Sequence, residues 1–214
     1  MLPTLPVIYE DAHIIVVNKP SNMLTHPENV PRKEKKFISF LQRSFGKVWN
    51  VHRLDCETSG VLVMAFTDDA AAHISAQFRE GTTLKRYIAV VSGHVDGSLT
   101  HVSLPLRADY ENRPLQVVDK ENGKESETSV KLVKVEIDET GFLSSVVELT
   151  PLTGRTHQLR LHMLHSGHAI LGDTMYATGA DLAKSDRLLL HASSLEFENP
   201  ASGKRMRFTA ECPF

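Results

Sequence analysis

The chain has 214 residues, 41% of them hydrophobic, which is enough for one domain with a full core or for one domain in two lobes. Its formal net charge of -2 excludes a uniformly basic surface, so any site for a polyanion must be a local cluster. The first residues include no basic n-region and no long apolar h-region, so we expect no signal peptide, and no apolar run is as long as a membrane span. We therefore expect a cytoplasmic protein with no membrane contact, in which Cys56 and Cys212 are reduced thiols, with a disulfide between them as the alternative.

The first part of the chain alternates short apolar runs with polar turns. Strands are predicted at 7–9 and 14–17, because each run is apolar and polar residues separate them. The basic segment 27–36 is predicted to be a solvated loop, with contact to phosphate as the alternative. The apolar positions of 37–45 fall at helical spacing, and Gly46 suits the C-terminal cap of the helix that they predict.

The middle of the chain begins with a buried strand, predicted at 61–66 from a continuous apolar run. A helix follows, because Thr67 can cap it and the two acids after Thr67 favour the positive end of the helix dipole. This helix is predicted to end at Gly81. A strand is predicted at 84–91, and turn residues then separate further strands from 95 to 148.

The last part of the chain is predicted to hold one helix and two late strands. Thr156 can cap a helix that runs to about Ser166 and is closed by Gly167. The late strands are predicted at 188–190 and 205–208. Strands outnumber helices and most connections are too short for a helical crossover, so we expect an α+β fold with a largely antiparallel mixed sheet and flanking helices.

Asp55 comes first among the residues that could carry chemistry. It precedes the buried strand, where an ionised carboxylate is expensive to desolvate unless it is paired. If residues 51–55 are extended, Arg53 and Asp55 share one face, and a nearby arginine keeps a carboxylate ionised. Such a group can act as a nucleophile or a base. The alternative is a structural salt bridge at the end of a strand.

Arg155 is the second candidate, since it lies in a loop just before the predicted helix cap. Its rigid guanidinium suits bidentate pairing with a carboxylate or a phosphate, and a structural bridge is the alternative. Arg160 falls inside the helix and is expected at the surface. Four histidines between 157 and 168 could suggest a metal, but no acid or cysteine lies at the usual ligand spacing, so we predict no metal site.

Tyr87 is the third candidate, on a strand where it follows two cations, Lys85 and Arg86. A tyrosine on a strand is ordinarily a core or sheet-surface residue. Beside a nucleic-acid site, however, its ring would give a base a surface on which to stack, worth about 1–3 kcal/mol.

Several blocks of the sequence together resemble the RluA family of pseudouridine synthases, over about residues 7–210. The central block is His52-Arg53-Leu54-Asp55 with Thr58-Ser59-Gly60. The other blocks follow in the family's order, and they are Val17-Asn18-Lys19-Pro20-Ser21, Lys85-Arg86-Tyr87-Ile88-Ala89, Gly154-Arg155-Thr156-His157-Gln158-Leu159-Arg160 with Gly172-Asp173-Thr174-Met175-Tyr176, and Leu189-Leu190-His191-Ala192.

The resemblance implies an isomerase that converts selected uridines of RNA to pseudouridine and needs no cofactor. It implies one catalytic domain over residues 1–214, with a central RNA-binding cleft and the pseudouridine synthase fold. Because the first catalytic strand is predicted to begin by Val7, we expect no room for the accessory RNA-binding module of the S4 type. We also expect a bacterial protein that acts as a monomer.

The same resemblance implies roles for particular residues. Asp55 would be the essential catalytic carboxylate, Arg155 would pair with it, and Tyr87 would stack on the target uracil. Four further residues would bind the RNA: Arg53, Leu190, His52 and Lys85. Arg53 would fill the gap left by the flipped uridine, and Leu190 would lie under the base.

The substrate expected from the resemblance is structured RNA. Short chains of this kind resemble the ribosomal large subunit pseudouridine synthase A branch, whose members modify large-subunit ribosomal RNA and tRNA stem-loops. Departures from the family pattern fall in supporting loops, at Asn22, Met23 and Ala169. Two other functions stay open, a glycosidase with Glu57 as its second carboxylate and an RNA-binding module without catalysis. Whether Asp55 attacks the base, attacks the sugar or removes a proton also stays open.

Overall fold

The computed structural model describes residues 6–25 and 37–214, and the basic segment 27–36 lies outside the described residues. The chain divides into two units. Unit 1 comprises Met1–Lys85 and His191–Pro213, and unit 2 comprises Arg86–Leu190 and Phe214.

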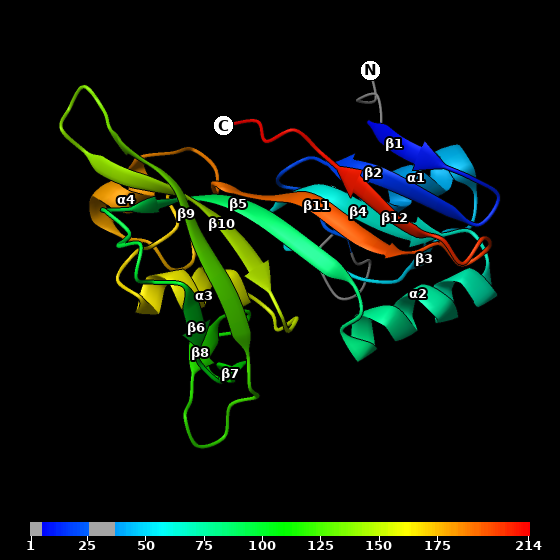
Figure 1. Cartoon of the computed structure of the whole chain (residues 1–214), viewed down its shortest axis with the longest axis horizontal. Helices are drawn as coiled ribbons and strands as arrows, with labels where there is room; N and C mark the ends of the chain where they lie inside the picture. Colours follow the sequence, from blue (N-terminus) through cyan, green and yellow to red (C-terminus); the bar gives the residue numbers. More distant parts are fainter. Residues whose placement is uncertain (1–5, 26–36) are drawn as a thin grey trace. The chain divides into compact units, whose positions relative to one another are not determined.

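Unit 1 is built on a mixed sheet in which β1, β2, β4 and β11 are neighbours in that order, with β3 paired to β4 and β12 to β11 (Figure 1). The pairing of β4 with β11 is parallel and the other pairings are antiparallel. The strands are β1 (Val7–Glu10), β2 (Ile14–Lys19), β3 (Trp49–Asn50), β4 (Ser59–Ala65), β11 (Leu190–Glu198) and β12 (Arg205–Thr209).

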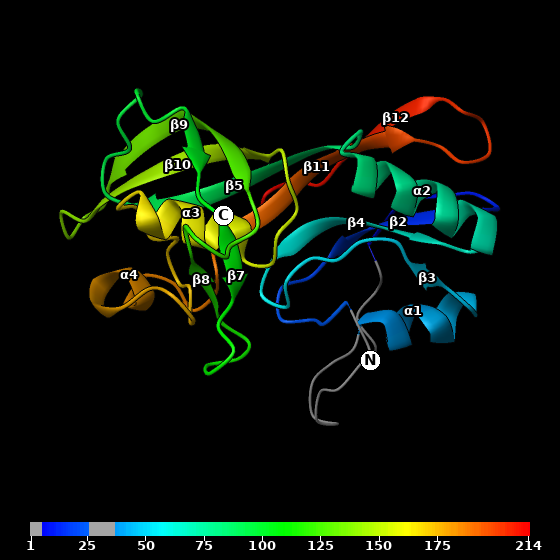
Figure 2. The same cartoon turned by 90° about the horizontal axis from the view of Figure 1, so that it is seen from below.

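Two helices belong to unit 1, α1 (Phe37–Phe45) and α2 (Asp68–Glu80) (Figure 2). The predicted caps of α2 are confirmed, since the Thr67 side chain accepts the backbone N–H of Ala70 at 3.2 Å and Gly81 takes a left-handed φ of 73°. Ala70 and other apolar residues of α2 pack with β2 and β4 into a core that excludes water. Local sequence signals therefore fix the ends of this helix, and the sheet buries its apolar residues.

Unit 2 is built on an antiparallel sheet in which β5, β10, β9 and β6 are neighbours in that order, and a separate hairpin is formed by β7 and β8. Apolar residues of α3 pack on the core of this sheet (Figure 2). The elements are β5 (Leu84–Ser92), β6 (His101–Ser103), β7 (Leu106–Ala108), β8 (Gln116–Val118), β9 (Glu127–Ile137), β10 (Leu143–Pro151), α3 (Gln158–His165) and α4 (Gly179–Ala183).

The predicted α+β class with mostly antiparallel strands is confirmed. Two element predictions are wrong in detail. A late strand is predicted at 188–190, but β11 begins only at Leu190. Leu188 instead packs in the core of unit 2 outside a strand. Thr156 does not cap α3, because His157 occupies the N-cap position with a φ of 55°. Among the described residues, no helix has both the length and the apolar character needed to cross a membrane.

Candidate active site

Asp55 lies in a loop between β3 and β4, and residues 51–58 belong to no strand. The side-chain alternation considered for an extended 51–55 segment therefore does not apply. The loop closes on itself, since the backbone N–H of Thr58 donates to the Asp55 carbonyl at 3.2 Å. Leu54 is buried, Asp55 is half-buried and Arg53 is exposed. The carboxylate is thus held near the surface by an apolar anchor at the preceding residue.

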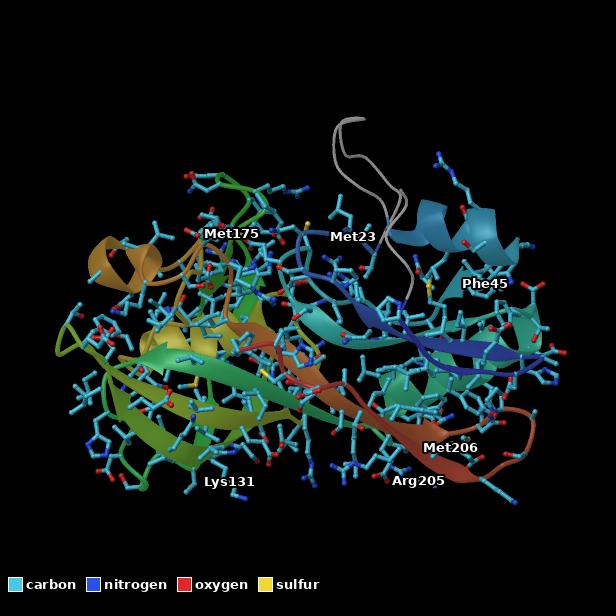
Figure 3. The ribbon with its side chains drawn as sticks, turned by 90° about the horizontal axis from the view of Figure 1, so that it is seen from above. Met23, Phe45, Lys131, Met175, Arg205 and Met206 are labelled. Carbon is cyan, nitrogen blue, oxygen red and sulfur yellow. The ribbon has the colours of Figure 1, made fainter. Side chains whose placement is uncertain are left out.

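Lys19 fixes this loop from the end of β2. Its side chain is 0% exposed, and its ammonium donates to the carbonyls of Pro20, Met23 and Cys56 at 2.9, 2.9 and 3.0 Å. A buried ammonium needs such partners, because an unpaired charge is costly in the interior. Met23, which is labelled in Figure 3, also donates its backbone N–H to the Cys56 carbonyl at 3.1 Å. The residue after Asp55 is therefore tied to the segment that follows β2.

Two hydroxyls complete the support of the loop. Ser21 donates to the Glu57 carbonyl at 2.6 Å, and Thr25 donates to the Leu54 carbonyl at 3.0 Å. Sequence reasoning included Lys19 and Ser21 in a family block but gave them no role, because the carbonyls of Cys56 and Glu57 that they bind lie far along the chain. Cys56 and Cys212 are both thiols, as predicted.

His52 is held by contacts within unit 1. Its Nε2 accepts the backbone N–H of Val63 at 3.1 Å, and its ring stacks on Phe78 with centroids 4.4 Å apart. Burial, with the positive charge of Lys85 as a second cause, lowers the pKa of His52 to about 3. The ring is therefore neutral at physiological pH. These contacts give His52 a structural role, and its contact with RNA stays a prediction.

Tyr87 and Leu190 both belong to unit 2. Tyr87 lies on β5 opposite Leu149 of β10, and its ring packs against the apolar core of this unit while remaining half-buried. Leu190 is 3% exposed and is part of the same core. Lys85 precedes them in unit 1, and burial lowers the pKa of its ammonium.

Arg155 is exposed on the loop between β10 and α3. Its Nε donates to the carbonyl of Glu125 at 3.0 Å, and its backbone N–H donates to Oε1 of Gln158 at 3.0 Å. Gln158 is buried and donates to the carbonyl of Glu127 at 2.8 Å, so the loop is tied to β9. The arginine is therefore presented on a fixed loop. Its pairing with Asp55 of unit 1 stays a prediction.

The prediction that Arg160 lies at the surface is wrong, because its side chain is only 1% exposed. It forms an ion pair with Asp173, which the family block placed thirteen residues later but to which we gave no role. Arginine is expected inside a protein only when it is paired, and a helical position by itself does not reveal the partner.

The histidines near α3 bind protein groups. His157 Nδ1 lies 2.6 Å from the Tyr176 hydroxyl, His162 Nε2 lies 2.9 Å from the Ser126 hydroxyl, and His168 Nδ1 lies 2.9 Å from the Ser92 carbonyl. Within the described ranges, no group of three or more histidines, cysteines or acids is placed to hold a metal ion. The candidate residues therefore divide between the two units: Asp55 lies on a supported loop of unit 1, and Tyr87 and Arg155 lie in unit 2.

The sequence profile described as RNA pseudouridylate synthase matches residues 13–165, which is most of the chain. The chain belongs to this family and is an RNA pseudouridine synthase, an isomerase that modifies RNA. The resemblance read from the sequence blocks is confirmed.

The particular relatives are proteins named dual-specificity RNA pseudouridine synthase RluA. The protein of that name from Escherichia coli is 44% identical over 212 residues, covering 99% of this chain and 95% of its own. The Yersinia pestis protein is 43% identical, covering 97% and 99%. The Vibrio vulnificus protein is 41% identical, covering 99% of this chain and 85% of its own.

Solved structures agree with this assignment. Human RNA pseudouridylate synthase domain containing 1 has a TM-score of 0.85 and 29% identity, covering 100% of this chain and 86% of its own. Human RNA pseudouridylate synthase domain containing 4 has a TM-score of 0.72 and 23% identity, covering 97% and 88%, and it supports the fold alone.

Proposed function

We propose that this pseudouridine synthase acts on two kinds of RNA, a hairpin loop of large-subunit ribosomal RNA and the anticodon stem-loop of tRNA. The support is that the relatives named dual-specificity RNA pseudouridine synthase RluA match almost the whole chain. In this proposal the protein acts in the cytoplasm as a monomer and takes no cofactor.

The chemistry makes specific demands on the protein. Moving uracil from its N1 to its C5 attachment is redox-neutral and needs no external energy. The base must, however, be detached, turned and rejoined while it is held. Such a site needs a stacking platform, a closed pocket and one group that reacts with the base or the sugar.

Asp55 is proposed as the reacting group, and the observation that carries this role is the support of its loop. Lys19 donates to the carbonyl of Cys56, the next residue, and two hydroxyls bind the carbonyls on either side of that pair. A carboxylate presented by a fixed loop loses little entropy when it reacts, because its geometry is set before the substrate arrives. Arg155 is proposed to pair with it, and Tyr87 to stack on the target uracil.

Base flipping is the proposed route by which the uridine reaches Asp55. Extruding a base costs a few kcal/mol, and the cost is least where the base is already unpaired. Sequence reading of RNA likewise favours loops over duplexes. Because the net charge is -2, broad electrostatic attraction cannot hold the RNA, and the hairpin shape and the flipped base must supply the specificity.

The test uses RNA labelled with tritium at C5 of uridine, since bond formation at that carbon expels its hydrogen. Isolated ribosomal and anticodon hairpins are compared with their full-length RNAs, and we expect both hairpins to release tritium at comparable rates. Reaction of intact ribosomal RNA alone would overturn the dual-substrate proposal. Release of free uracil would indicate a glycosidase, and binding without release would indicate a non-catalytic module.

A further inference from the structure

Unit 2 contains a hollow of about 930 Å³ beside Arg155. One wall is the hairpin of β7 and β8 with the start of its connecting loop, and the other includes Lys124 and the loop from Gly154 to Thr156. The volume falls within the range of roughly 300–1,000 Å³ that is usual for small-ligand sites. The hollow therefore has room for a ligand next to a residue of the proposed active site.

One hydroxyl ties the two walls together. Tyr176 accepts the backbone N–H of Gln116, in β8, at 2.9 Å, and the same hydroxyl lies 2.6 Å from Nδ1 of His157. His157 is two residues after Arg155 and stands at the N-cap of α3. The hairpin wall and the arginine wall are thus fixed to each other before any ligand binds, which lowers the entropic cost of binding.

The acids around the hollow are largely engaged within the hairpin. Asp109 accepts hydrogen bonds from the backbone N–H groups of Glu111 and Asn112 and from the Asn112 amide. Arg107 forms an ion pair with Asp119 at 2.5 Å, so these two charges cancel. The exposed cations that line the hollow are Lys124 and Arg155, and the exposed acid is Glu111.

Tyr110 gives the hollow an aromatic surface. It is 67% exposed, an unusual fraction for a tyrosine ring in a folded protein. The guanidinium carbons of Arg107 and Arg113 lie 5.9 and 5.5 Å from its ring centroid, within the range of cation–π attraction. A ring held this way, with cations nearby, has the features of a stacking platform for a nucleic-acid base.

We propose that the hollow binds a single-stranded nucleotide of the substrate RNA other than the target uridine. Its base stacks on Tyr110, and its phosphate is held by Lys124 and Arg155. This inference rests on the proposed function, because the nucleotide belongs to the substrate RNA, and Arg155, which is proposed to pair with Asp55, would also contact the phosphate of this nucleotide. It assigns part of the substrate recognition to the β7–β8 hairpin.

The test measures the affinity of a fluorescent RNA stem-loop by anisotropy across a series of salt concentrations. Tyr110→Ala should weaken binding about tenfold, whereas Tyr110→Phe should bind as the unchanged protein does. Lys124→Gln should weaken binding and lower the slope of log affinity against log salt by about 0.7, the value for one phosphate of a single strand. Lys120→Gln is the matched control, an exposed lysine of the same region that does not line the hollow.

Glu111→Gln makes the test independent of folding, because removing this acid should tighten binding, and a misfolded protein cannot bind more tightly. Lys120→Gln should leave both the affinity and the rate of tritium release as they are in the unchanged protein. Wild-type affinity in both Tyr110→Ala and Lys124→Gln would overturn the inference, as would equal losses in Lys124→Gln and Lys120→Gln. If the unchanged protein binds RNA without tritium release, the proposed function fails. The affinity series would then still test whether the hollow binds RNA.

Discussion

The guanidinium of Arg160 and the carboxylate of Asp173 form a bidentate ion pair inside unit 2, with Nε–Oδ2 and Nη2–Oδ1 distances of 2.7 and 2.5 Å. The side chains are 1% and 2% exposed. Oδ1 of Asp173 also accepts the backbone N–H groups of Met175, at 2.9 Å, and Tyr176, at 3.1 Å. The pair thus joins α3 to the segment that carries Tyr176, whose hydroxyl in turn contacts His157.

Asp173→Asn is expected to destabilise the protein severely. The change leaves the Arg160 charge buried without its carboxylate, and breaking a buried pair in this way costs about 3–5 kcal/mol. Urea unfolding gives the free energy of unfolding. Glu196→Gln is the control, because Glu196 pairs with Arg205 at the surface, where a lost pair costs about 0–1 kcal/mol. A similar, small loss in both variants would contradict the structural role of the pair.

The fold could be predicted where the signals are local. Thr67 and Gly81 mark the ends of α2 by capping chemistry that acts within a few residues. Lys19, Arg160 and His157 could not be placed in the same way. Their positions depend on partners distant in the sequence or on a left-handed backbone that propensity disfavours, so composition and spacing carry no signal of them.

The candidate site was predicted mainly by resemblance. From spacing alone, Asp55 could be either part of a structural salt bridge or a catalytic group, and Tyr87 could be an ordinary sheet residue. The structure adds what supports the Asp55 loop, which is the buried ammonium of Lys19 and the hydroxyls of Ser21 and Thr25. No periodicity could have revealed these contacts, because each joins a side chain to a backbone carbonyl of another loop.

Asp55→Asn is expected to abolish pseudouridine formation while preserving the fold and most of the RNA affinity. The amide keeps the size of the side chain but cannot act as a nucleophile or a base, and losses of about 10²-fold or more follow when such a group is removed. Single-turnover tritium release measures the effect. Glu57→Gln is the matched control and should stay active. Turnover of Asp55→Asn above about one per cent of the unchanged protein would contradict the role.

Arg155→Lys is expected to lower turnover by about 10²-fold, although the charge is kept. Lysine has no rigid fork, so it cannot reproduce bidentate pairing, and a small misplacement of a reacting group costs about this much. The rate of tritium release at saturating RNA is the measurement. Arg205→Lys, which alters an exposed pair with Glu196, should leave the rate unchanged. Near-normal turnover of Arg155→Lys would show that pairing with Asp55 is wrong or unimportant.

Tyr87→Phe is expected to bind RNA as the unchanged protein does, whereas Tyr87→Ala should bind less tightly by about 1–3 kcal/mol. Stacking needs the ring and not the hydroxyl. Because the ring also packs against the core of unit 2, urea unfolding of both variants must accompany the binding titration. Equal defects in the two variants would assign the role of Tyr87 to its hydroxyl.

His52 is expected to make the protein less stable in acid. Its pKa is about 3 in the folded protein, because burial disfavours the charged ring, against an ordinary value of 6.5 in the unfolded chain. Between about pH 6.5 and pH 3 the unfolded chain therefore binds more protons, so the free energy of unfolding falls as the pH falls. Above about pH 6.5 this contribution is complete and constant.

His52→Gln removes the titrating ring and keeps a group that can accept the Val63 N–H. Urea unfolding at several pH values should give this variant a shallower loss of stability in the acid window than the unchanged protein shows. Part of the slope should remain, because burial also lowers the pKa of His162. Gln42→Ala, at an exposed position of α1 that does not titrate, is the control and should leave the slope unchanged. An unaltered slope in His52→Gln would mean that the folded protein accommodates the protonated ring, against the burial that the stacking on Phe78 indicates.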